Sequence, residues 1–193
     1  RGKAAIVVNT TVGCGNANQL EVLQWLQNEF AGDDFAIIAI PTNDFCGPGV
    51  THGKWSQGIT CGSDSKNYGE DVYGTTFDYS EMVHSIPNDL VSKDIGSKPG
   101  HNGLGQPFGE PHDLYKTIRE HINEINRVTK ALEGEPTGDE YYSWWLNLKG
   151  GGGSMGGNYE KYLIDKDGYV IKHFQCTVLN YDSEKTVKEA AKE

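Results

Sequence analysis

The stretch Ala4-Ala5-Ile6-Val7-Val8-Asn9-Thr10-Thr11-Val12-Gly13-Cys14-Gly15 carries the strongest structural signal in the chain. Its apolar half predicts a strand buried on both faces, and the glycines around Cys14 predict a turn before a helix. Unpaired backbone N–H groups and the helix dipole favour an anion there, so a thiol ionises more easily. Cys14 is therefore a candidate reaction centre. The alternative is a small buried apolar residue that ends a strand.

The residues after Cys14 predict a βαβ unit. Apolar side chains from Leu20 to Phe30 recur at helical spacing, and Ala31-Gly32 closes that helix. Phe35 to Ile40 forms a second buried strand, which Pro41 stops. Two parallel strands joined by a crossover helix place Cys14 at the carboxyl edge of a sheet, where open α/β folds place their chemistry.

The chain after Pro41 predicts loops, helices and a hairpin. The first three are a short helix over 55–59, a strand within 75–83 and a surface loop over 85–111. A long amphipathic helix follows, marked by apolar residues from 114 to 132, and then a glycine-dominated segment over 149–157. The chain ends with a β-hairpin over 159–174 and a closing helix from residue 183. The order βαβ, helix, ββα predicts a thioredoxin-like α/β fold. We expect a three-layer sandwich with a central mixed β-sheet flanked by helices.

Composition narrows the function. The 193 residues carry a net charge of -10, which leaves no basic face for nucleic acid or anionic membranes. No apolar run approaches the ~20 residues that span a bilayer. The four cysteines contain no C-x-x-C pair and the histidines show no ligand spacing, so we expect no metal site. The chain begins at Arg1, and the sequence leaves a cytoplasmic or a secreted location open.

Several sequence blocks resemble the glutathione peroxidases, in that family's order and over most of the chain. They are residues 2–9, Cys14-Gly15, Ile40-Pro41-Thr42-Asn43-Asp44-Phe45, Tyr73-Gly74-Thr75-Thr76-Phe77, His112-Asp113-Leu114-Tyr115-Lys116 and residues 158–168. The resemblance implies one thioredoxin-like domain over residues 1–193. The family's usual N-terminal strand or hairpin has no counterpart here, which suggests cleavage, truncation or disorder before Arg1.

The resemblance also implies an antioxidant activity, the reduction of hydrogen peroxide or organic hydroperoxides. Cys14 matches the peroxidatic position, whose thiolate attacks the peroxide and becomes a sulfenic acid. Glutathione or thioredoxin would then serve as reducing co-substrate, with no bound cofactor. Cys61 and Cys46 are candidates for a resolving cysteine, while Cys176 is expected in the core.

The resemblance places three hydrogen-bond donors around the reactive sulfur. The family's glutamine position is Asp44 here, its tryptophan position is Gly157, and Asn158 matches its asparagine. A carboxylate near the thiolate would raise the thiol pKa by repulsion, and Gly157 has no indole N–H. The assignment of Gly157 would change if the glycine tract let Trp144 or Trp145 fold back toward the sulfur. It would also change if the tract were an insertion that shifts the alignment. The alternative role for both tryptophans is core or interface packing.

Two functions therefore remain open. The first is a thiol peroxidase with an altered set of donors, which we favour because the position of Cys14 between strand and helix does not depend on the missing side chains. The second is a non-catalytic member of the family with a structural or binding role, because Asp44 and Gly157 replace two donors. An oligomer is possible through the long loop and the paired tryptophans.

Overall fold

The predicted βαβ unit forms the centre of the molecule. The computed structural model describes residues 2–30, 34–85, 101–102, 104–107, 109–118, 120 and 158–174. Strand β1 (Ala4–Thr10), helix α1 (Gln19–Phe30) and strand β2 (Phe35–Pro41) follow one another. β1 and β2 are parallel and in register from Ala4 opposite Phe35 to Thr10 opposite Pro41. This confirms the elements expected around Cys14.

The central sheet is mixed and has the strand order β5-β2-β1-β6-β7. β5 (Asp78–Tyr79) runs parallel to β2, whereas β6 (Lys161–Ile164) runs antiparallel to β1 and to β7 (Val170–Phe174). β6 and β7 form the predicted hairpin. Its turn is closed by hydrogen bonds from the backbone N–H groups of residues 167–169 to the Asp165 carboxylate.

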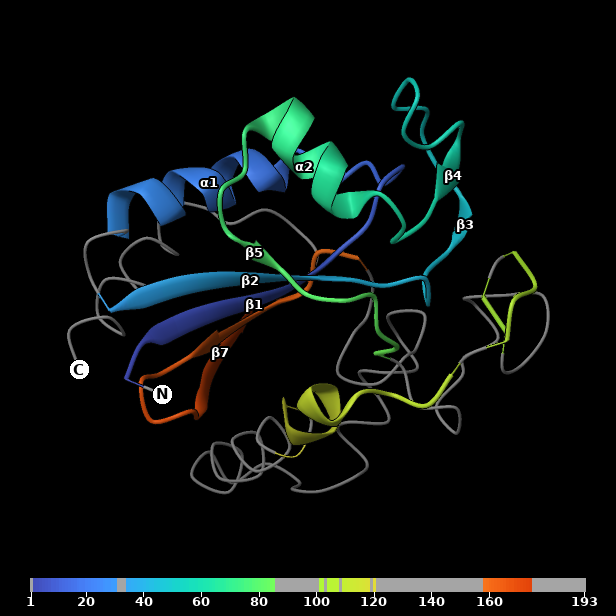
Figure 1. Cartoon of the computed structure of the whole chain (residues 1–193). Helices are drawn as coiled ribbons and strands as arrows, with labels where there is room; N and C mark the ends of the chain where they lie inside the picture. Colours follow the sequence, from blue (N-terminus) through green and yellow to red (C-terminus); the bar gives the residue numbers. More distant parts are fainter. Residues whose placement is uncertain are drawn as a thin grey trace, which may run out of the picture.

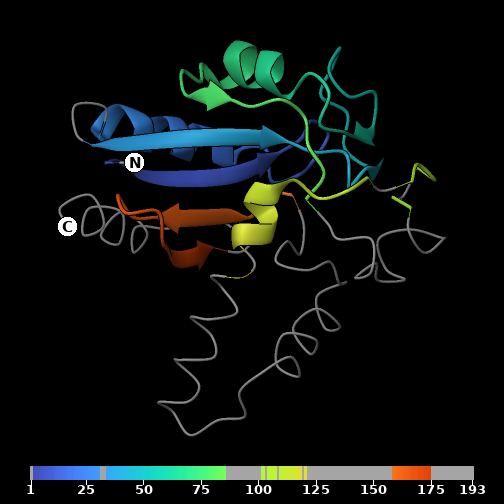
Figure 2. The ribbon, with the colours of Figure 1, turned by 60° about the horizontal axis from the view of Figure 1, so that its bottom comes forward.

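Helical segments cover both faces of the sheet. α1 and α2 (Ser65–Tyr73) lie on one face, and a helical segment over residues 113–118 lies on the other (Figures 1 and 2). Side chains of β1 alternate between these layers: Ile6 packs with α1, whereas Val7 packs with Ile118. Alternation is the expected geometry of a strand buried on both faces. The three-layer, thioredoxin-like prediction is confirmed.

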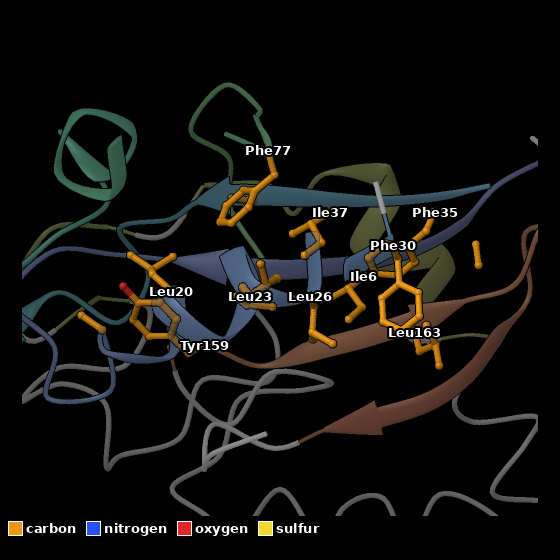
Figure 3. Packing of buried hydrophobic residues seen from close by; sticks show 14 of the residues in the cluster. Ile6, Leu20, Leu23, Leu26, Phe30, Phe35, Ile37, Phe77, Tyr159 and Leu163 are labelled. Atoms are coloured by element: carbon orange, nitrogen blue, oxygen red, sulfur yellow. The ribbon is translucent and has the colours of Figure 1, made fainter. Parts of the chain in front are cut away.

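The larger core lies between α1 and the sheet (Figure 3). Leu20, Leu23 and Leu26 of α1 are almost fully buried against β1 and β2. Full burial of one leucine side chain stabilises the fold by about 1.5–3 kcal/mol. Tyr159 closes this core near the start of α1, where its ring lies beside Leu20 (Figure 3).

The segment between β2 and β5 differs from the prediction. The short helix expected over 55–59 is wrong: residues 53–58 form turns, and Gln57 has a φ of 49°, which a right-handed helix excludes. The turns join two short antiparallel strands, β3 (Gly47–Pro48) and β4 (Ile59–Thr60). The sequence did not predict α2 either, because its buried positions carry few apolar side chains.

Other predicted elements are only partly covered by the structure. The helix after Pro111 is helical over 113–118, and its expected continuation to 132 lies outside the described residues. The glycine tract, the closing helix and most of the 85–111 loop also lie outside them. Within the described part of the chain, no helix is long and apolar enough to cross a bilayer.

Candidate active site

Cys14 lies at the carboxyl end of β1, in the turn that leads into α1. Its side chain is half-buried and packs against the main core. The backbone N–H of Asn16 points to the Cys14 Sγ at 3.5 Å, and the N–H of Ala17 donates to the Cys14 carbonyl at 3.2 Å. The sulfur therefore lies against one backbone N–H group just before the first turn of a helix, an arrangement that favours a thiolate.

Gly13 fixes the direction of this turn. It has a φ of +78°, and a Cβ at this position would lie 2.1 Å from the carbonyl oxygen of Ile59. The Gly13 carbonyl accepts hydrogen bonds from Val50 N–H at 2.8 Å and Thr60 Oγ1 at 3.2 Å. The loop that carries Cys14 is therefore clamped onto β4 by contacts that only a glycine permits.

Two tyrosines from different parts of the chain interact electrostatically with Cys14. Burial, followed by the charge of a Cys14 thiolate, raises the pKa of Tyr159 well above its usual value. Burial and a hydrogen bond to Tyr73 raise the pKa of Tyr68, and Cys14 adds to that shift. Both phenols are therefore protonated at neutral pH, and both lie close enough to Cys14 to feel its charge.

Tyr68 of α2 belongs to a small polar cluster inside the apolar layer. Its hydroxyl lies 2.9 Å from His52 Nδ1 and 3.3 Å from the Tyr73 hydroxyl. The His52 ring packs edge-on against Tyr68. His52 Nε2 is buried and has no hydrogen-bond partner among the described residues. An imidazole in hydrogen-bond contact with a phenol can exchange a proton with it.

Asn158 and Tyr159 lie in the turn before β6, against the end of β1. Tyr159 has a φ of 63°, which is rare for a bulky residue. Its N–H donates to the Asn9 carbonyl at 3.0 Å, and its hydroxyl donates to the Thr11 carbonyl at 2.6 Å. The Asn158 Oδ1 is buried and has no hydrogen-bond partner among the described residues. A strained backbone and an unsatisfied amide oxygen are features that cluster at functional sites.

Asp44 is bound to the segment that follows β5. Its buried carboxylate accepts hydrogen bonds from Ser85 N–H at 2.5 Å and Ser85 Oγ at 2.8 Å, and it pairs with His84 Nδ1 at 2.7 Å. Its charge contributes to the raised pKa of Cys46 and of Tyr115. Asp44 thus has a structural set of partners that the glutamine position did not predict.

Cys61 lies next to the Cys14 loop. Its backbone and that of Val12 exchange two hydrogen bonds, of 2.7 and 3.0 Å. Such a pair has its Cα atoms about 5.5 Å apart, so the Cα atoms of Cys14 and Cys61 are separated by roughly 13 Å at most. Cys46 is buried, and burial followed by the charge of Cys61 raises its pKa to about 12. None of these three cysteines is in a disulfide.

The remaining predicted site residues are not placed. Gly157 and Cys176 lie outside the described residues, as do Trp144 and Trp145. In the described part of the chain, no group of three or more His, Cys, Asp or Glu side chains could hold a metal ion.

The sequence did not single out Tyr68, His52 or Tyr159. Tyr159 directly follows Asn158 in a block that resembles the glutathione peroxidases, so the sequence could have predicted that it lies near the site. Tyr68 and His52 lie in a segment rich in Gly, Ser, Asn and Asp, for which the sequence predicts only a short helix over 55–59. Only the spacing of the buried residues Ser65, Tyr68 and Gly69 indicates a helix face there.

Comparison with known proteins gives one curated relative and several solved structures. No protein-family model matches the chain. The hydroperoxy fatty acid reductase gpx1 of Synechocystis sp. is 27% identical over 174 residues, which cover 90% of this chain and 73% of the relative. The crystal structure of T. cruzi GPX1 gives a TM-score of 0.52 at 17% identity and covers 100% of this chain and 84% of that one. Trgpx in apo form gives a TM-score of 0.49 at 21% identity, with 100% and 83% covered.

Proposed function

The chain is a distant member of the glutathione peroxidase family with a thioredoxin-like fold, and on that premise we propose that it is a thiol-dependent peroxidase. Cys14 is its peroxidatic residue. The observation that carries the proposal is the surrounding of this sulfur: the Asn16 N–H directed at Sγ, with the protonated hydroxyls of Tyr68 and Tyr159 within range of its charge. The Asn16 N–H and the Tyr68 hydroxyl are the proposed replacements for the donors that Asp44 and Gly157 do not offer, because the Tyr159 hydroxyl donates to the Thr11 carbonyl.

In the first half-reaction the Cys14 thiolate attacks the distal oxygen of the hydroperoxide. The O–O bond breaks, the sulfur becomes a sulfenic acid, and the leaving oxygen departs as water or alcohol after taking a proton. We assign this proton to the Tyr68 hydroxyl, which His52 can re-protonate across their 2.9 Å contact. Asn158 is the remaining amide of the family pattern, and its unsatisfied side chain supports a role toward the reacting oxygens.

In the second half-reaction Cys61 is the proposed resolving residue. Its sulfur attacks the sulfenic acid, water leaves, and a Cys14–Cys61 disulfide forms. The Val12–Cys61 pairing brings the two main chains together, and the disulfide forms when the Cα atoms of Cys14 and Cys61 lie within about 7 Å of each other. Glutathione or thioredoxin then returns both thiols.

The proposed substrates are hydrogen peroxide and organic hydroperoxides. The curated relative is named for the reduction of hydroperoxy fatty acids, which supports organic hydroperoxides within this class. A second function has one observation in its favour. The Asp44 carboxylate is committed to Ser85 and His84, so the family's amide donor is absent at that position and the chain could act as a non-catalytic scaffold.

The test is hydroperoxide consumption by the intact chain and by Cys14→Ser, with glutathione and thioredoxin supplied in parallel. Cys176→Ser is the matched control, because it makes the same chemical change at a cysteine outside the proposed chemistry. We expect turnover in the intact chain and in Cys176→Ser, and none in Cys14→Ser. Equal rates in all three proteins, with folding verified by circular dichroism, would support the scaffold.

A further inference from the structure

The short hairpin beside the Cys14 loop has a cysteine next to each of its two strands, at the same end of the hairpin. β3 and β4 are antiparallel, with Gly47 opposite Thr60 and Pro48 opposite Ile59 (Figure 1). The ladder ends at Gly47 and Thr60, and a continuation of this register by one residue would place Cys46 opposite Cys61. Directly opposed residues of an antiparallel pair have Cα atoms about 4.5–5.5 Å apart, and a disulfide requires about 4.4–6.8 Å.

The hydrogen-bond pattern of the hairpin shows which kind of pair this is. The Gly49 N–H donates to the Gly58 carbonyl at 2.8 Å, so residues 49 and 58 form a hydrogen-bonded pair. Hydrogen-bonded and non-hydrogen-bonded pairs alternate along a ladder. A ladder continued to Cys46 and Cys61 would make them a non-hydrogen-bonded pair, the type in which the Cα atoms approach to about 4.5 Å and the side chains are closer.

Contacts on the far side of the pair hold it in this position. The Gly62 N–H donates to Asn43 Oδ1 at 2.6 Å, and a Cβ at Gly62 would lie 2.6 Å from the Thr42 backbone nitrogen. The same N–H interacts with the Cys46 sulfur, and the charge of Cys61 adds to the raised pKa of Cys46. The segment that follows Cys61 is therefore packed directly against the segment that precedes Cys46, and no side chain fits at Gly62.

We propose that Cys46 and Cys61 form a second dithiol–disulfide pair that receives the oxidation from Cys14. This inference rests on the proposed peroxidase function. Once a Cys14–Cys61 disulfide has formed, Cys46 attacks the Cys61 sulfur, a Cys46–Cys61 disulfide replaces the first one, and Cys14 leaves as a thiolate that takes the proton released by Cys46. Over the cycle, one hydroperoxide and the two thiols of Cys46 and Cys61 yield water, an alcohol and one disulfide.

Geometry favours the final position of this disulfide. The backbone of Cys61 is bonded to Val12, two residues before Cys14, whereas the Cys46 sulfur interacts with the N–H of Gly62, the residue directly after Cys61. Only Cys61 of the proposed pair is partly exposed, so an external thiol reductant would attack the disulfide at this sulfur. The buried, protonated Cys46 thiol makes the exchange slow at neutral pH and faster as the pH rises.

The first experiment tests the pair without any peroxidase chemistry. A Cys14→Ser/Cys176→Ser double variant retains only Cys46 and Cys61, and it is incubated with oxidised dithiothreitol. We expect the loss of both thiols in a monomer and a peptide mass for a Cys46–Cys61 disulfide. A protein in which both thiols persist, or in which Cys61 reacts without Cys46, would overturn the proposal. Adding Cys61→Ser to this background is the control and should form no intramolecular disulfide.

The second experiment follows the transfer. Intact chain receives one equivalent of hydroperoxide and is quenched at intervals with an alkylating reagent before peptide mass analysis. The Cys14–Cys61 disulfide should appear first and be replaced by Cys46–Cys61, with Cys14 again open to alkylation, while Cys46→Ser should stop at Cys14–Cys61. An intact chain that ends at Cys14–Cys61 would overturn the relay. If peroxide oxidises no thiol while Cys46 and Cys61 still form a disulfide with oxidised dithiothreitol, the peroxidase function and the relay would be overturned. The Cys46–Cys61 pair itself would stand.

Discussion

The Tyr159 hydroxyl donates a 2.6 Å hydrogen bond to the carbonyl oxygen of Thr11. This bond joins the turn before β6 to the loop that carries Cys14, although the two residues are 148 positions apart in sequence. The bond is fully buried, and the same hydroxyl lies within range of the Cys14 charge. Tyr159 therefore both holds the reactive loop and contributes to its electrostatic environment.

Replacing Tyr159 by phenylalanine should weaken both properties. The Thr11 carbonyl would lose its buried donor, which costs about 1–3 kcal/mol of unfolding free energy. We also expect slower reaction of Cys14 with hydroperoxide, measured by stopped-flow fluorescence, because the loop loses its anchor. Tyr169→Phe, at an exposed position of the β6–β7 turn, is the control and should change the unfolding free energy by less than about 0.5 kcal/mol. Equal stability of both variants in urea would contradict the role of Tyr159.

A substitution of Gly13 by alanine should disturb the site severely. A Cβ would lie 2.1 Å from the Ile59 carbonyl, and the φ of +78° disfavours any other residue by about 1–3 kcal/mol before that clash is counted. Gly15→Ala is the matched control, because nothing lies within 4 Å of its Cβ position. We expect Gly13→Ala to lower the urea midpoint and the peroxide reactivity, and Gly15→Ala to leave both near the original values. Similar midpoints for the two variants would contradict the described packing of β4 on this loop.

The sequence predicts the core around Cys14 but not all the contacts that hold it. The continuous apolar run of β1 and the leucine spacing of α1 are local signals, so the βαβ core and the position of Cys14 follow from them. The clamp on Gly13 comes from β4, a two-residue strand with no periodicity to read. Tyr68 comes from α2, and this helix has only one large buried side chain, so its sequence lacks the apolar periodicity that predicts a helix.

The partners of Asp44 and Cys46 depend on contacts that no local pattern encodes. The resemblance places Asp44 at the family's glutamine position, and no sequence pattern predicts its hydrogen bonds to Ser85. The proposed pairing of Cys46 and Cys61 depends on the register of β3 with β4, and a shift by one residue would separate the two sulfurs. The sequence identified the chemistry-bearing residues but not the network that orients them.

The raised pKa of Cys46 predicts a specific pattern of alkylation. With a pKa of about 12 and a buried side chain, Cys46 should remain unmodified by iodoacetamide at pH 7–9 in the folded protein, whereas the half-buried Cys61 should react. Peptide mass analysis across this pH range measures both sites, and the unfolded protein in urea is the control in which Cys46 reacts. Modification of Cys46 at the rate of Cys61 in the folded chain would contradict its burial.

The same shift predicts a loss of stability at alkaline pH. The unfolded thiol loses its proton near its ordinary value of 9.0, while the folded thiol keeps it until about pH 12. In that window the folded state binds more protons than the unfolded state, so the free energy of unfolding falls as the pH rises. Urea unfolding from pH 8 to pH 11 should show a shallower fall in Cys46→Ser than in the intact chain. Parallel curves for the two proteins would contradict the shift.

The Asp44 carboxylate is expected to be a structural requirement. In Asp44→Asn an amide N–H2 replaces one acceptor, so a donor of Ser85 or His84 would lose its partner. We expect a loss of about 1–3 kcal/mol of unfolding free energy in urea. Asp113→Asn, at a carboxylate that is 91% exposed, is the matched control and should be neutral. A neutral Asp44→Asn would show that the network is not required.

Tyr68→Phe tests the proposed proton donor. It removes the hydroxyl that contacts His52 and retains the buried ring. Loss of a positioned acid typically lowers a rate by about 10²–10⁴-fold, so the rate constant of Cys14 with hydroperoxide should fall by at least about tenfold. Tyr73→Phe, which keeps the Tyr68 hydroxyl and removes its neighbour, should have a smaller effect. An unchanged rate in Tyr68→Phe would move the proton source to water.

The most direct test of the central claim is the fate of Cys14 after a single equivalent of hydroperoxide. The reduced protein, carrying Cys61→Ser to prevent resolution, is mixed with hydroperoxide and a sulfenic-acid trap, and its peptides are analysed by mass. A peroxidatic Cys14 predicts a stoichiometric adduct at Cys14 within seconds and none at Cys46. An unmodified Cys14, or modification no faster than that of the same cysteine in urea-unfolded protein, would contradict the account.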